Sequence, residues 1–202
     1  QFEIHRRVAS QTDTLAVRTY IDLTRSEMAF ALGNPNVAFR ARPLPVCEPP
    51  LPAYKAEQDP VVKRIDGPSL YGTGKFFHGP MFQIGGKVAQ TETGVLHCEV
   101  AAPKRGLEEL GFGNAALALD FVFQLASLKA VQIHQRAALP VSVQKVWFAP
   151  EILACEKITA CLLYRAKQPI PESVVADAQF LDAAGNLIGW MEEIRCQLVS
   201  PT

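Results

Sequence analysis

The stretch from Asn114 to Val131 reads NAALALDFVFQLASLKAV, and it decides the fold. Apolar residues surround Asp120 on every side of the helical wheel, and a helix that is apolar all round is normally buried. Asp is a poor helix former, and burying its charge without partners is costly. Gln124 lies four residues on, so both polar groups share one helical face. We therefore expect either a satisfied core aspartate or a carboxyl that stays protonated in an apolar pocket and serves as a proton donor.

Length and composition limit the number of domains and the kinds of partner that the chain can have. The chain has 202 residues, 49% of them hydrophobic, and its 20 basic residues balance 20 acidic ones. This length suggests one domain, or one and a half, with ample material for a core. A net charge near zero provides no steering field for nucleic acid or an anionic membrane surface. No apolar run approaches the ~18 residues that a transmembrane helix needs. The sequence therefore predicts no nucleic-acid partner and no membrane partner.

The cysteines indicate a reducing compartment. The chain has five, an odd number, and none forms a CxxC pair, so neither a disulfide framework nor a zinc site is indicated. Reduced, buried thiols in a cytoplasmic protein are expected, with no metal site. The chain begins at Gln1 within a strand-like stretch, and we expect it to be part of a longer protein.

Alternating apolar residues predict strands on both sides of a proline-rich linker. From residue 43 to residue 68 the chain carries seven prolines, a density that disfavours regular ladders. Strands are predicted over residues 2–9, 14–23, 37–42, 81–91, 94–101, 141–148, 157–166, 173–182 and 187–198. We divide the chain into a strand region (1–45), a linker (46–67) and a main domain (68–202). The architecture is α+β, with an antiparallel sheet curled around one long central helix.

Several short motifs then resemble a known family. They are Leu70-Tyr71, FFHGPMFQ over residues 76–83, LDFVFQ over residues 119–124, Leu139-Pro140-Val141, and LDAAGNLIG over residues 181–189. Together they resemble the dehydratase domain of polyketide synthases and related multienzyme fatty acid synthases, including those that make polyunsaturated fatty acids. Such domains are double hotdogs. The resemblance implies that residues 68–202 are the second hotdog and residues 1–45 the last strands of the first.

The resemblance implies a reaction. Family members remove water from a 3-hydroxyacyl chain carried on the phosphopantetheine of an acyl carrier protein, which gives a 2-enoyl chain. A first-hotdog histidine takes the α proton, and the second-hotdog aspartate, here Asp120, protonates the leaving hydroxyl. Gln124 would orient that carboxyl or the substrate hydroxyl. No other cofactor is implied. The partners would be the carrier protein and the other domains of the synthase, and a homodimer is left open.

The surrounding motif residues complete the predicted site. His78 stands where the family often has tyrosine, and we consider it a positioner, a substitute base or a locally bonded loop residue. The turn at Gly79 and Pro80 would let backbone approach the acyl chain closely, with Phe82 as an apolar wall. Tyr71 and Leu117 are expected to line the pocket. For Tyr71, a bulky residue, packing near the pocket is a simpler expectation than a catalytic role.

One departure from the family leaves the activity open. The first-hotdog histidine of the family lies in a His-x-x-x-Gly-x-x-x-x-Pro pattern, which this sequence lacks. The catalytic histidine would then lie upstream of Gln1, or the protein lacks it. Three alternatives follow: half of an acyl-carrier-linked dehydratase, a noncatalytic or product-shaping hotdog that binds an acyl chain, and a hotdog isomerase or thioesterase that uses Asp120 as a base.

Overall fold

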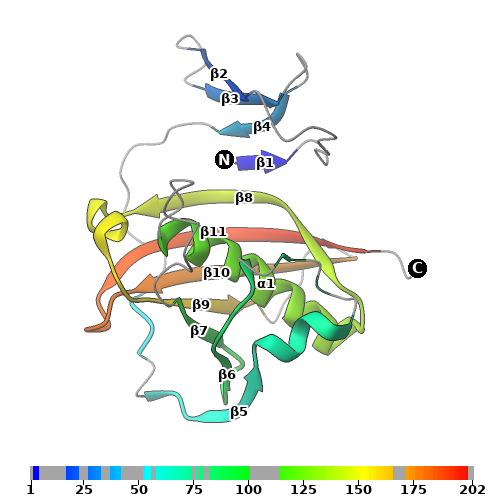
Figure 1. Ribbon diagram of the computed structural model, residues 1–202, viewed down its shortest axis with the longest axis vertical. Coiled ribbons are helices and arrows are strands. Elements are labelled where there is room, and N and C mark those ends of the chain that lie inside the picture. Colours follow the sequence, from blue (N-terminus) through cyan, green and yellow to red (C-terminus); the bar gives the residue numbers. More distant parts are fainter. Residues whose placement is uncertain are drawn as a thin grey trace.

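The structure is a computed structural model. It describes residues 2–4, 17–22, 27–32 and 37–41 as strands, and also residues 52–55, 58–73, 76, 78–79, 82–100, 114–165 and 172–199. In these parts eleven strands form one sheet, and paired strands run antiparallel. Part of this sheet curls around the helix α1 (Asn114–His134). Figure 1 shows the sheet curling about this helix. The fold is an antiparallel hotdog with one central helix, as the sequence predicts.

The order of the sheet places the helix against its middle strands. From one edge to the other the order is β2-β3-β4-β1-β8-β11-β10-β9-β7-β6-β5. The seven strands from β8 to β5 surround α1, and α1 packs against β7, β8, β9, β10 and β11. Their bounds are β5 (Val61–Asp66), β6 (Lys87–Thr91), β7 (Leu96–Val100), β8 (Ala138–Phe148), β9 (Ile158–Tyr164), β10 (Ser173–Leu181) and β11 (Leu187–Leu198).

Four N-terminal strands extend the same sheet. They are β1 (Phe2–Ile4), β2 (Val17–Asp22), β3 (Glu27–Leu32) and β4 (Val37–Ala41). Strand β1 pairs with β8 through Phe2 opposite Val143 and Glu3 opposite Ser142. Through β1, these strands join the outer edge of the seven strands that surround α1. Strand β3 is absent from the prediction because its sequence, EMAFAL, lacks the β-branched residues that favour strands.

The helix carries more apolar character than the sequence analysis allowed for. It is 21 residues long and, by length and composition, apolar enough to cross a membrane, which corrects the statement that no such segment exists. In the fold, 61% of its most apolar window is buried. Side chains such as Val122 and Leu125 are fully covered. The helix therefore serves as the core of the hotdog, and its apolar surface is used against the sheet.

Two predicted segments are shorter or more regular than expected. The predicted strand over residues 81–91 is a strand only from Lys87, because residues 82–86 form an irregular loop that reaches the helix. The predicted linker ends in β5, whose residues Val61–Asp66 pair with β6. Pro60 lies immediately before this strand, where a missing amide does not break the ladder. Proline density alone therefore overestimates the length of the linker.

A described part of the linker lies against the outer face of the sheet. The side chain of Gln179 on β10 donates to Pro52 O at 2.8 Å and accepts from Tyr54 N at 2.6 Å. Tyr54 also packs on a small second cluster that includes Cys161 and Leu181. Every residue of β10 is consequently buried, on the helix side by the core and on the other side partly by this strap, residues 52–55.

His97 on β7 makes stability depend on pH. Its ring centroid lies 6.4 Å from that of Tyr54, and burial, aided by Arg64, lowers the pKa of His97 below its ordinary value of 6.5, while Asp59 and Glu99 act in the opposite direction. A histidine with a lowered pKa binds fewer protons in the folded state than in the unfolded state. Its contribution to stability is therefore present above pH 6.5 and is lost as the pH falls.

We expect acidification from about pH 7.5 to about pH 5.5 to destabilise the wild type more than His97→Gln, which has no imidazole to protonate. Urea denaturation of both proteins at both pH values measures the difference. An equal loss in the two proteins would remove His97 as the cause.

Candidate active site

Asp120 lies on the half of α1 that faces away from the sheet. Its side chain is 29% exposed, so the expectation of an aspartate sealed in the core is wrong. The reason is that Ala116, Leu119 and Phe123, at helical spacing around it, form a stripe that is only partly covered. Asp120 is therefore an accessible carboxyl in an apolar surround, which is the condition that a proton donor to a bound molecule needs.

Gln124 holds one oxygen of this carboxyl. The side chain of Gln124 is buried, with 1% of the residue exposed. Its Nε2 donates to Asp120 Oδ2 at 2.6 Å and to Phe82 O at 2.7 Å. The prediction that the two polar groups share one helical face and meet is confirmed. Gln124 engages Oδ2, whereas the other carboxyl oxygen, Oδ1, lies 3.6 Å from His78 Nε2.

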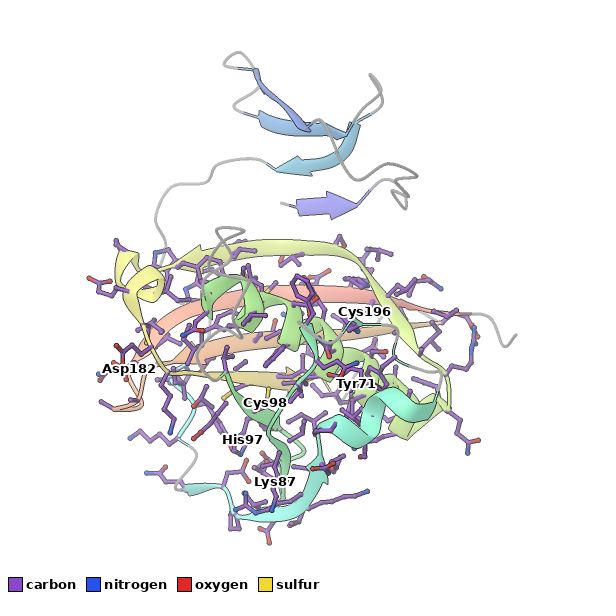
Figure 2. All side chains as sticks on the ribbon, viewed as in Figure 1. Tyr71, Lys87, His97, Cys98, Asp182 and Cys196 are labelled. Atoms are coloured by element: carbon purple, nitrogen blue, oxygen red, sulfur yellow. The ribbon has the colours of Figure 1, made fainter. Side chains whose placement is uncertain are left out.

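Tyr71 completes the hydrogen bonding of Gln124. It lies on the short helix η2 (Pro68–Thr73), beside α1 (Figure 2), and its hydroxyl donates to Gln124 Oε1. The same hydroxyl accepts from Ile84 N at 2.7 Å. Burial raises the pKa of Tyr71 to about 12, and the charge of Asp120 adds to the rise. We predicted Tyr71 as a residue of the substrate pocket, whereas its hydroxyl is bonded to Gln124 and Ile84.

The loop from His78 to Ile84 faces the polar side of the helix. His78 Nε2 lies 3.6 Å from Asp120 Oδ1, beyond hydrogen-bond length but close enough for an ion pair when the imidazole is protonated. Gln83 Nε2 donates to His78 O at 3.0 Å, and Phe82 N donates to Gly79 O at 2.9 Å. These bonds shape the loop into a turn over the carboxyl. Gly79 is exposed, and Pro80 lies outside the described residues.

The apolar part of the site differs from the prediction in detail. Phe82 is partly covered and packs on the core beside the carboxyl, as an apolar wall would. Leu117 has 4% of its surface exposed and lies within the core cluster. Sequence reasoning did not single out Leu119 and Phe123, which are partly exposed near Asp120. Their spacing of one and three residues from Asp120 is the signal that identifies them.

The site contains a limited set of chemical groups. Its described members offer one carboxyl, one imidazole, one carboxamide and one phenol, at Asp120, His78, Gln124 and Tyr71. Among the described residues, no three His, Cys, Asp or Glu side chains gather as a metal site would require. The described thiols of Cys98, Cys161 and Cys196 are buried elsewhere, and burial raises their pKa values. The arrangement suits proton transfer between a bound molecule and Asp120.

The comparisons with known proteins agree with this geometry. A family model described as the polyketide synthase dehydratase N-terminal domain matches residues 51–202. The chain therefore belongs to the polyketide synthase dehydratase family, as its motifs suggested. Because the description speaks of an N-terminal domain, our placement of this hotdog as the second of two stays a prediction. No functionally curated protein matches the sequence.

Solved dehydratase domains share the fold. The dehydratase domain of PpsC from Mycobacterium tuberculosis, in complex with C12:1-CoA, is 18% identical; the match covers 98% of this chain and 73% of that one, with a TM-score of 0.68. The dehydratase domain of the CurJ module of the curacin polyketide synthase is 16% identical, over 99% and 74% of the two chains, at 0.74. An N-terminal dehydratase of the difficidin assembly line is 15% identical, over 99% and 76%, at 0.73.

Proposed function

We propose that the chain carries the acid half of a dehydratase that acts on 3-hydroxyacyl chains bound to an acyl carrier protein. The observation that carries the proposal is the Asp120 carboxyl, which is partly exposed on the core helix and held through Oδ2 by Gln124. The family to which the chain belongs supports dehydration within a polyketide synthase. The 3-hydroxyacyl substrate and the carrier-bound thioester are our additions.

The proposed reaction is an elimination of water. A histidine base removes the proton next to the thioester, the electron pair forms the carbon–carbon double bond, and the C–O bond breaks. Hydroxide is a poor leaving group, so Asp120 donates its proton to the departing oxygen and water leaves. The product is a 2-enoyl thioester. The apolar side chains of Leu119 and Phe123 beside the carboxyl accommodate the acyl chain.

The other site residues would bind and orient. Gln124 fixes the carboxyl, and Phe82 with the turn at Gly79 and Pro80 lies along the acyl chain. Among the groups facing Asp120 we assign His78 as a positioner, because its Nε2 is 3.6 Å from Oδ1 and this leaves little room for a substrate carbon between base and acid. The substrate arrives on the phosphopantetheine of the carrier protein, and no further cofactor is needed. We place the reaction in the cytoplasm, among the domains of a multienzyme synthase.

The histidine base of the proposed reaction is not identified among these residues, and we propose that a first hotdog supplies it. The family histidine pattern is absent from the 202 residues. A CurJ dehydratase in which a histidine is replaced by phenylalanine is described as an inactive mutant, so that relative needs a histidine. We therefore assay the chain alone and joined to its natural upstream sequence, with a 3-hydroxyacyl carrier protein and mass spectrometry of the acyl arm. Dehydration by the joined protein and little or none by the chain alone is the expected result.

Two outcomes would overturn the proposal. A joined protein that binds the acyl carrier but leaves the 3-hydroxy group intact would favour the noncatalytic, product-shaping alternative. Release of free acid or migration of a double bond, without loss of water, would favour a thioesterase or an isomerase.

His78→Gln should lower the dehydration rate of the joined protein by about tenfold to a hundredfold, because it removes an imidazole that lies 3.6 Å from the acid, while some turnover remains. A glutamine keeps a side-chain donor near Asp120 but cannot take up a proton at neutral pH. Initial rates with wild type and variant, at saturating substrate, provide the comparison. Complete loss in His78→Gln, equal to that in an Asp120 variant, would instead assign His78 as the base.

A further inference from the structure

We propose that Tyr71 is a positioning residue that sets the geometry of the Asp120 carboxyl through Gln124. The inference rests on the proposed dehydration for its kinetic test, but its structural basis is independent of the reaction. Tyr71 lies 53 positions before Gln124 in the sequence, and the described hydrogen bonds of its hydroxyl join it to Gln124 and Ile84, not to Asp120. The hydrogen-bonded route from its hydroxyl to the carboxyl runs through the carboxamide of Gln124.

The hydroxyl of Tyr71 is placed by two partners on different segments. It accepts from Ile84 N at 2.7 Å and donates to Gln124 Oε1. A phenol that already accepts from a backbone amide has its own proton free for the second partner. Ile84 has 1% of its surface exposed, so this end of the chain of hydrogen bonds is fixed in the core. Tyr71 thus connects the loop after His78 to the helix.

The bond from Tyr71 decides which end of the Gln124 carboxamide faces Asp120. With Oε1 occupied by the phenol, Nε2 is directed at two acceptors, Asp120 Oδ2 and Phe82 O. A flipped amide would set its oxygen against both acceptors, which is unfavourable because Gln124 is buried, with 1% of the residue exposed. Tyr71 therefore keeps a donor on Oδ2, and the other oxygen, Oδ1, remains the position for the transferable proton.

The phenol remains a donor across the working pH range. Burial raises the pKa of Tyr71 to about 12, so its hydroxyl stays protonated wherever the protein is folded and assayed. Its ring also packs edge-on against Phe76 at 5.9 Å between centroids. Tyr71→Phe keeps this packing and removes only the hydroxyl. The substitution leaves Gln124 Oε1 and Ile84 N without their described partner.

Tyr54 offers a matched control. Its hydroxyl also donates within the protein, to Asp59 Oδ2 at 3.1 Å, and burial likewise raises the pKa of Tyr54 to about 12. Its described contacts are with the strap and the outer cluster, away from Gln124. Tyr54→Phe therefore removes a comparable hydroxyl without touching the carboxyl network.

The kinetic test is a double-mutant cycle in the joined protein, with Tyr71→Phe, Gln124→Met and their combination. We expect Tyr71→Phe to lower kcat about tenfold or more while KM changes less than about twofold, because the lost contact acts on the acid and not on the bound chain. Tyr71→Phe should add little in the Gln124→Met background. Tyr54→Phe should keep kcat within about twofold of wild type. An unchanged kcat in Tyr71→Phe, or an effect that multiplies fully with that of Gln124→Met, would overturn the proposal.

A spectroscopic readout separates this proposal from the proposed function. In the 202-residue chain, the ¹³C NMR signal of the Asp120 carboxyl should shift in Tyr71→Phe and stay in place in Tyr54→Phe. A fixed Asp120 signal overturns the role of Tyr71 whether or not water is eliminated. An Asp120 signal that shifts in Tyr71→Phe as expected, together with a joined wild-type protein that shows no dehydration, contradicts only the proposed function. If Tyr71→Phe does not fold, 3-fluorotyrosine at position 71 keeps the hydroxyl and strengthens it as a donor, and an unchanged Asp120 signal then overturns the proposal.

Discussion

Asp120→Asn should abolish dehydration by the joined protein, with a fall in rate of about 10³-fold or more, while the fold stays intact. An amide has the volume of the carboxyl but no proton acidic enough to give to the leaving hydroxyl. Its oxygen can still accept from Gln124 Nε2, which lies 2.6 Å from Oδ2 in the wild type. The rate is followed as formation of the enoyl thioester on the carrier protein, and folding is followed by thermal melting.

Asp66→Asn provides the control for this substitution. Asp66 is exposed, and its Oδ2 accepts from Ser69 N at 3.3 Å, a bond that an amide oxygen can also make. We expect its turnover to equal that of the wild type. Undiminished dehydration by Asp120→Asn would remove Asp120 from catalysis and leave it as a partly buried residue with a structural role.

Gly67→Ala should destabilise the protein by about 3 kcal/mol or more, or prevent folding. Gly67 N donates to Gly86 O at 2.9 Å, so the two backbones are in direct contact. A Cβ at position 67 would overlap the carbonyl oxygens of both Ile84 and Gly86. These are backbone atoms and cannot move aside as the end of a flexible side chain can. Because Gly67 directly precedes η2, the added methyl group would also push Tyr71 away from Ile84.

Urea denaturation compares this variant with Gly72→Ala. An added Cβ at Gly72 meets no atom within 4 Å, so this substitution should change stability by less than about 0.5 kcal/mol. Equal stability of the two variants would show that the contact between Gly67 and the loop is not required.

The helix and the acid could be predicted from the sequence because both depend on local periodicity. Asp120 and Gln124 are one helical turn apart, so their meeting follows from the geometry of α1 alone. Apolar and polar residues alternate along the strands after the helix, and the predicted bounds of these strands fall within a few residues of the observed ones. The family resemblance adds a role for the carboxyl, which no pattern of spacing provides.

The features of the fold and the site that the sequence did not predict depend on contacts between distant segments. The hydrogen bond from Tyr71 to Gln124 spans 53 positions, and the irregular loop that carries Ile84 was predicted as a strand. The exposure of Asp120 was also missed, because a helical wheel records which residues neighbour it on the helix but not which side the sheet covers. Strand β5 is regular only because β6 pairs with it, although its sequence lies in the proline-rich region.

The strap over β10 determines where this protein can be cut for transfer into another multienzyme. Gln179 loses both carboxamide partners, and Leu181 loses part of its cover, if residues 52–55 are cut away. A graft that starts at residue 68, just before the first family motif, would lose strand β5 as well as the strap, and it would carry an uncovered sheet that is prone to aggregate. A piece that starts before Pro52 keeps both, so an engineer who exchanges domains of this family should place the upstream junction there and not at the first family motif.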